Sequence, residues 1–269
     1  MELMNAYLRH RPYLQRPNGN DVLKLLAWSY ERTGLSDRAA RTYRVLASRG
    51  LKEPELVLGL ARNLMVEGDH PGVVQALGPA EMKALAGADQ RAAASLLGRS
   101  LVRAGQYRQA EAVLAELIQG PGDPRAAAAD YAAWGKALRH LGRLGQAVEA
   151  YDQAEKLLAQ EMAEEPHRPE LRQQCFLNCL EAGGAAREGE MYAASEGHLR
   201  RAQEMAPGED QKAQAMYELS QTCAAAGKAQ EAADLLAELA KLPAQPWAGM
   251  AQRHLADLQL APRLAQVGK

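Results

Sequence analysis

The sequence predicts an all-α protein in which short antiparallel helix hairpins repeat along most of the 269 residues. Three observations support this prediction. A glycine interrupts the helical segments at spacings of 34, 37, 37 and 85 residues, small residues lie at fixed distances from each glycine, and alternating β-branched runs are almost absent. A period near 34 residues is typical of helical repeats. The turn glycines are Gly34, Gly68, Gly105, Gly142 and Gly227.

The residues around each turn glycine indicate how a hairpin packs. Glycine ends the first helix because it takes the left-handed backbone conformation at little cost. The small residues seven before and five after it then face each other and let the two helices approach closely. Large apolar residues eight before and nine after fill the flanking space. The residues seven before are Ala27, Ala61, Gly98, Gly135 and Ser220, and those five after are Ala39, Val73, Ala110, Ala147 and Ala232.

The two units around Gly142 and Gly105 carry further residues at regular positions. One has Tyr131, Trp134, Gly135, Leu138, Gly142, Ala147, Tyr151 and Ala154, and the other has Leu97, Gly98, Leu101, Tyr107, Ala110, Leu114 and Leu117. These positions resemble the tetratricopeptide repeat, W-x2-L-G-x2-Y followed by A-x3-F and a proline, although the closing proline is mostly missing. The resemblance covers roughly residues 20–260. It implies a right-handed superhelical solenoid of about six repeats, in which the first helices line a concave groove.

The array is expected to divide into regular repeats at 20–165, an enlarged irregular unit at 166–208 and a further repeat at 209–243. In the irregular unit, the stretch GGAAREGE at 183–190 looks too long for a standard turn. The segment 244–269 starts as another first helix and is expected to cap the last repeat, since an open end needs a polar cover. Residues 1–19 are expected to form a leader or capping helix, unless they were cut from a longer parent.

Composition and charge exclude several classes of function. Basic and acidic residues nearly balance, 32 against 33, which argues against nucleic-acid and membrane-surface partners. No apolar run approaches the length of a membrane span, and the N-terminal segment lacks the features of a secretory signal. We therefore expect a cytoplasmic protein without membrane insertion, or a periplasmic protein if the chain was cut from a longer parent.

The sequence offers no constellation of catalytic or metal-binding residues, so we expect neither an enzyme nor a cofactor nor a metal site. Phosphate-binding, nucleophile and zinc-protease motifs are absent. Cys175 and Cys179 share one helix face and are interpreted as small core residues. A structural zinc site needs four convergent ligands. The two candidate histidines, His167 and His198, are better explained as loop or surface residues.

Partner-binding residues are expected on the first helices, six positions before each turn glycine. This position neighbours the small contact residue, should face the groove, and is basic in three consecutive units. The alternative interpretation is a solvated face without function. Some family members bind a C-terminal carboxylate in this groove with a residue set called the carboxylate clamp. We do not expect this clamp here, because Trp28, Arg62 and Arg99 stand where it needs asparagine in its first two units. The predicted site residues are Arg62, Arg99 and Lys136 in this column, with Lys24, Trp28, Arg103, Arg139 and Tyr217 near it.

These residues predict a non-catalytic scaffold that binds a protein or peptide of acidic character in its groove, for example as an assembly or secretion-type adaptor. The alternative is a structural module that self-associates within a larger complex, and the oligomeric state is left open. Recognition of nucleic acid by helical repeats is a distant third interpretation. Its one-base-per-repeat code needs polar side chains in every unit. The candidate column Leu58, Ser95 and Ala132 does not supply them.

Overall fold

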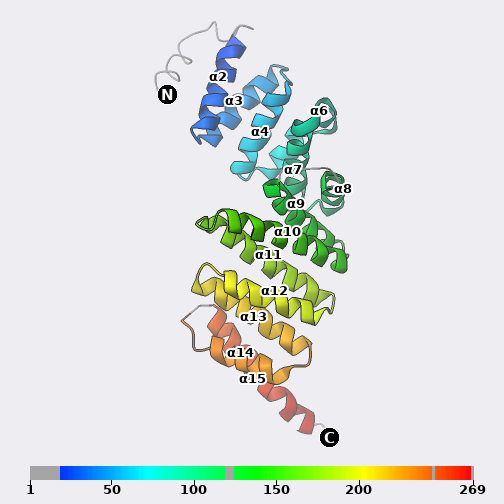
Figure 1. Cartoon of the computed structure of the whole chain (residues 1–269), viewed down its shortest axis with the longest axis vertical. Helices are drawn as coiled ribbons and strands as arrows, with labels where there is room; N and C mark the ends of the chain where they lie inside the picture. Colours follow the sequence, from blue (N-terminus) through cyan, green and yellow to red (C-terminus); the bar gives the residue numbers. More distant parts are fainter. Residues whose placement is uncertain (1–18, 119–123, 244–245, 268–269) are drawn as a thin grey trace. The chain divides into compact units, whose positions relative to one another are not determined.

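The computed structural model describes residues 19–118, 124–243 and 246–267, and all the elements in these ranges are helices (Figure 1). The chain folds as two compact units, one ending at Gly120 and the other starting at Pro121. The predicted all-α class is therefore confirmed. None of the described helices is both long and apolar enough to cross a lipid bilayer. The expected N-terminal leader at 1–19 lies, except for its last residue, outside the described residues.

The first unit contains three helix hairpins. They are α2 (Gly19–Arg32) with α3 (Ser36–Ser48), α4 (Pro54–Val66) with α5 (His70–Ala76), and α7 (Gly87–Arg103) with α8 (Tyr107–Ile118). A short extra helix, α6 (Pro79–Ala84), separates the second hairpin from the third. The hydrophobic core of the first unit runs through all three hairpins, from Leu26 and Tyr43 to Leu64 and Ala93.

The second unit contains three more hairpins and a final helix. They are α9 (Pro124–His140) with α10 (Leu144–Glu164), α11 (Pro169–Glu188) with α12 (Tyr192–Met205), and α13 (Glu209–Ala225) with α14 (Ala229–Leu239). The last helix, α15 (Trp247–Val267), packs on α13 and α14. The Tyr217 ring lies 5.9 Å from the Trp247 ring and 6.1 Å from the His254 ring, measured between centroids. The last helix therefore packs against both helices of the final hairpin.

The turns explain why each first helix stops. In the third hairpin, Gly105 has φ 73°, its N–H donates to the Val102 carbonyl at 3.1 Å, and the next N–H, of Gln106, donates to Leu101 at 2.9 Å. This pair of hydrogen bonds is the Schellman motif, which satisfies the last carbonyls of a helix and needs a left-handed residue. All five turn glycines have positive φ.

The irregular unit corrects one sequence-based expectation. The stretch 183–190 is not a long loop, because α11 continues through Glu188. The turn is the same Schellman motif with Glu190 in place of glycine: its φ is 57°, its N–H donates to Arg187 at 3.0 Å, and the Met191 N–H donates to Ala186 at 2.8 Å. The enlargement lies instead in the helices α10 and α11, which have 21 and 20 residues.

Counting from Glu190 restores the repeat register. The residue seven before it is Gly183, the residue five after is Ser195, and the residue nine after is Leu199. A Cβ atom on Gly183 would lie 2.5 Å from Leu199 Cγ, and the Ser195 hydroxyl donates to the Gly183 carbonyl at 2.8 Å. The two helices of this hairpin therefore touch where the pattern places a small residue, as they do at Gly98 with Leu114 and at Gly135 with Tyr151.

We predict opposite effects for one substitution at two glycines of this hairpin. Gly183→Ala should lower the free energy of unfolding by about 1–3 kcal/mol, because the new methyl group overpacks against Leu199. Gly197→Ala should raise it by up to about 1 kcal/mol, because Gly197 lies within α12 and a Cβ there would meet no neighbouring group within 4 Å. Chemical denaturation followed by circular dichroism measures both. Equal effects of the two changes would contradict the register.

A second prediction concerns the left-handed turn residue. Glu190→Gly should stabilise the protein by roughly 1 kcal/mol, because a non-glycine residue costs about 1–2 kcal/mol in this conformation. The matched control is Gly142→Ala, at φ 76°, which should destabilise. A stability loss for Glu190→Gly would instead show that the glutamate side chain contributes to the fold.

Candidate functional site

The predicted partner-binding residues all lie on first helices, divided between the two units. The first unit carries Lys24 and Trp28 on α2, Arg62 on α4, and Arg99 and Arg103 on α7. The second carries Lys136 and Arg139 on α9 and Tyr217 on α13. They therefore belong to two surfaces, which differ in character.

The surface of the first unit contains an open pocket of about 340 Å³. Two large apolar side chains at its edge are exposed, Leu25 at 66% and Trp28 at 57%. The Arg32 guanidinium lies 5.6 Å from the Trp28 ring centroid, a distance at which a cation attracts the ring face. Three predicted residues, Lys24, Trp28 and Arg62, thus share one pocket. Its remaining lining residues are Leu25, Tyr43, Glu53, Glu55, Leu56, Leu58 and Asp89.

The cations of this pocket already have carboxylate partners. Lys24 Nζ lies 2.7 Å from Glu53 Oε1, and Arg62 Nε lies 2.8 Å from Glu31 Oε1. The other oxygen of Glu31 accepts a hydrogen bond of 2.7 Å from the Tyr43 hydroxyl. Burial and this hydrogen bond to Glu31 raise the pKa of Tyr43, so it remains a donor. The predicted basic column is therefore neutralised at Arg62.

A glycine makes this network possible. A Cβ on Gly59 would lie 2.5 Å from Tyr43 Cζ, so the phenol ring of α3 passes against the bare backbone of α4. Its hydroxyl then reaches Glu31 at the end of α2. Three helices are joined in this way beside the pocket.

Helix α7 carries the cations that remain available to a ligand. Arg103 is exposed and Arg99 is half-buried. Within the described residues, neither has a carboxylate at ion-pair distance, in contrast to Lys24 and Arg62. A negatively charged group on a partner can therefore pair with them without displacing an internal one.

On the surface of the second unit, the predicted cations form a network of ion pairs with residues of another helix. Lys136 Nζ lies 3.1 Å from Glu181, and Arg139 contacts Glu181 at 2.6 Å. Arg139 also binds Glu188 through two nitrogens, at 3.1 and 2.6 Å, and the guanidinium lies over Gly184. This bidentate pair lowers the pKa of Glu188. The two predicted cations therefore hold α9 to α11.

Tyr217 does not belong to an exposed binding surface. The sequence places it among the groove contacts, but it is 9% exposed, and its ring packs between α13 and α15. The aromatic face is covered by Trp247 and His254 because α15 docks there. Tyr217 is a core residue that joins the cap to the last repeat.

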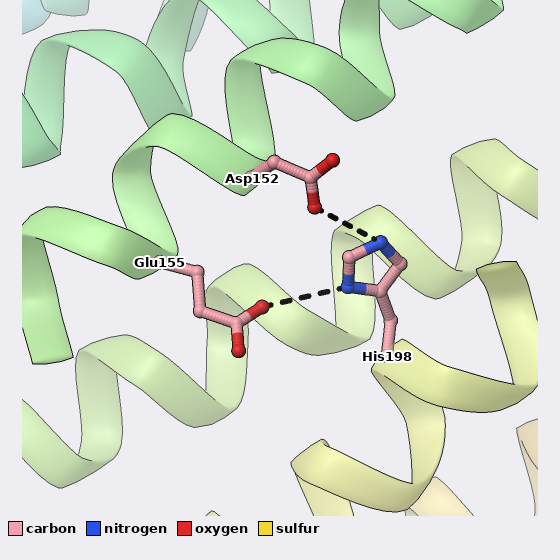
Figure 2. Close-up of side chains that lie close together, drawn as sticks. All are labelled: Asp152, Glu155 and His198. Atoms are coloured by element: carbon pink, nitrogen blue, oxygen red, sulfur yellow. Dashed lines mark ion pairs between the residues drawn. The ribbon is translucent and has the colours of Figure 1, made fainter.

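The two candidate histidines have different surroundings. His167 is exposed between α10 and α11, as expected. His198 is not a free surface residue: its side chain is 11% exposed and lies between Asp152 and Glu155 of α10 (Figure 2). Sequence analysis missed this cluster, because the position of His198 relative to α10 depends on the turn at Glu190.

The cysteines are buried, as their interpretation as core residues requires. Cys175 and Cys179 have their sulfur atoms 4.0 Å apart on α11. The hydrogen bond to Cys175, together with burial, raises the pKa of Cys179, which disfavours a reactive thiolate. Cys179 also contacts Glu155, whose pKa is lowered by hydrogen bonds from His198 and from this thiol.

Comparison with known proteins agrees with the hairpin fold. A family model described as "Tetratricopeptide repeat" matches residues 95–161. No curated protein matches the chain. Many solved structures are similar, at identities that establish the fold alone, and three of them serve as examples.

The first is PilW, a type IV pilus biogenesis factor, with a TM-score of 0.57 and 16% identity over 87% of this chain and 98% of that one. The second is YrrB, a tetratricopeptide-repeat protein with an unusual peptide-binding site, with a TM-score of 0.54 and 16% identity over 80% and 100%. The third is MamA of Desulfovibrio magneticus RS-1 from residue 41, with a TM-score of 0.52 and 19% identity over 69% and 94%.

We predict that the paired cysteines are dispensable for the fold. The double variant Cys175→Ala, Cys179→Ala should remain fully helical and lose only about 1–2 kcal/mol of stability, because two small buried groups are removed. Circular dichroism and thermal denaturation test this. Loss of the folded state would show that the thiols do more than fill space.

Proposed function

Because this chain is built on tetratricopeptide repeats, we propose that it is a non-catalytic scaffold that holds a peptide or partner segment against the first helices of its N-terminal unit. The observation that carries this proposal is the open pocket with Leu25 and Trp28 exposed at its edge. Adjacent exposed side chains of this size are typical of binding sites, where aromatic residues supply much of the affinity.

Apolar contact is the main contribution to affinity in this proposal. The exposed Leu25 and Trp28 line the pocket together with Leu56 and Leu58, which are buried. A large apolar side chain of the partner, placed between them, would remove apolar surface from water at about 25 cal/mol per Å². The lysine and arginine at the rim would then orient the bound segment.

The acidic character of the partner is proposed on the basis of α7. A carboxylate that approaches Arg62 must replace Glu31, so the number of ion pairs does not change. A carboxylate that approaches Arg99 or Arg103 makes a new pair. Exposed pairs contribute about 0.2–1 kcal/mol each. Two of them change the dissociation constant by roughly 2-fold to 30-fold, enough to select the partner's register.

Two of the similar structures support a role in assembly. The descriptions of YrrB and PilW name a peptide-binding site and pilus biogenesis, respectively. A chain with the same hairpin fold and an open pocket on its first helices is suited to such an adaptor role. Self-association through Leu25 and Trp28 is the alternative, and light scattering across a range of concentrations distinguishes it: a monomer that binds its partner favours the scaffold.

The decisive variant removes the aromatic anchor. Partners are recovered with the intact chain by pull-down and mass spectrometry, and the bound segment is prepared as a peptide. Trp28→Ala should weaken its binding by about 30-fold or more, the size of a hot-spot contact. The control is Val45→Ala, at an exposed position of α3 that does not line the pocket. Equal affinities of the two variants would contradict the proposed site.

A second experiment tests the acidic character. Arg99→Gln with Arg103→Gln should weaken the complex by roughly 2-fold to 30-fold and reduce its dependence on salt. The control is Arg108→Gln, on the exposed side of the second helix α8. Arg62→Gln should have a smaller effect than the α7 pair, since Glu31 already neutralises it. An unchanged salt dependence in the α7 variant would mean that these cations are only solvated.

A further inference from the structure

Three potential metal ligands converge between two second helices of the second unit, whereas the predicted partner-binding residues all lie on first helices. Asp152 and Glu155 are three residues apart on α10 and therefore point to the same side. His198 comes from α12 and reaches between them, as Figure 2 shows. Its Nε2 lies 3.4 Å from Asp152 Oδ1, and its Nδ1 lies 3.5 Å from Glu155 Oε2.

The spacing of these atoms suits a metal ion. One ligand atom from each residue lies within 4.8 Å of the other two. With metal–ligand bonds of about 2.0–2.2 Å, neighbouring ligands of a tetrahedral zinc ion are about 3.3–3.6 Å apart. The two carboxylates face opposite nitrogens of the imidazole ring, so a shared ion requires one side chain to change its rotamer. Asp152, whose side chain is 45% exposed, is the ligand with room to do so.

The surroundings hold the ligands in place. The Arg201 Nε lies 3.5 Å from Glu155 Oε1, the oxygen that does not face the histidine. Helix α11 packs against both α10 and α12 and so holds the two ligand-bearing helices together. Outer contacts such as that of Arg201 orient carboxylate and imidazole ligands in metal sites. Because the Asp152 side chain is half-exposed, water could complete the coordination from that side.

We propose that Asp152, Glu155 and His198 form a binding site for a divalent transition-metal ion of the zinc class. An imidazole nitrogen with two carboxylates selects zinc, cobalt or nickel over magnesium and calcium, which prefer oxygen ligands alone. In the metal-free chain the imidazole bridges the two carboxylates, and the ion takes the place of this bridge. The bound metal then links α10 to α12, two helices from successive hairpins.

The test measures metal binding directly. The full chain is dialysed against a chelator and titrated with Zn²⁺ by calorimetry, and Co²⁺ is used to record the visible absorption of the bound ion. One equivalent should bind, and the melting temperature should rise with zinc concentration. His198→Gln and Asp152→Asn should each weaken binding by more than about tenfold, since even loss of an outer contact has effects of that size.

Matched controls separate this site from nonspecific binding. His167→Gln removes an exposed histidine that lies beside Glu164 and Glu165, and Glu149→Gln removes an exposed carboxylate from α10 itself. Both should bind zinc as the unaltered chain does. Asp152 is exposed enough for its variant to fold, and circular dichroism checks each protein. Failure of the unaltered chain to bind either ion, or equal losses in His198→Gln and His167→Gln, would overturn the proposal.

Discussion

The close approach of two helices at small residues is the constraint on which the rest of this structure depends. At Gly183 and Leu199 the space between the helices is too small for one additional methyl group, and Gly98 and Leu114 repeat the arrangement, with a Cβ on Gly98 only 2.6 Å from Leu114. This contact fixes the rotation of each helix about its own axis. Successive residues of a helix point about 100° apart. Once the rotation of the helix is fixed, it therefore determines which of the neighbouring residues face the core and which face solvent.

The same contact decides where the two candidate sites lie. On first helices, the residue next to the small one turns outward, which exposes Trp28 and places Arg62 at the rim of its pocket. On the second helix α12, His198 is next to the contact residue Leu199 and points toward α10, the second helix of the preceding hairpin. The surface chemistry of first and second helices is thus a consequence of core packing.

Sequence reasoning predicted the hairpins because their signals are local. A turn glycine and its small neighbours, seven residues before and five after, span only thirteen residues, and each unit repeats them. The turn at Glu190 escaped prediction because it keeps the backbone conformation and the hydrogen bonds but not the residue type. Without that turn, the sequence did not fix the register of the irregular unit 166–208, and so the environment of His198 was unknown.

The charge partners were missed for a different reason. Arg62 and Glu31 are 31 residues apart, as are Arg187 and Glu218, so each ion pair joins side chains about one repeat apart. Sequence analysis compared the same position in successive repeats and so found the basic residues. It did not compare each basic residue with the acidic residues of the neighbouring repeat, which neutralise it. Tyr217 was misplaced because its position was judged from its own helix, whereas its exposure depends on α15.

The pairing of Arg62 with Glu31 makes ligand binding at that position an exchange reaction. The internal carboxylate acts as a tethered competitor whose local concentration never falls, and a ligand's carboxylate must displace it. Added salt weakens the internal pair and the external pair alike, so the two effects largely cancel. A weakly acidic segment in solution would gain nothing there, and under the proposed function only a segment already anchored beside Trp28 would compete on equal terms. The tethered glutamate would then disfavour acidic segments that lack an apolar anchor.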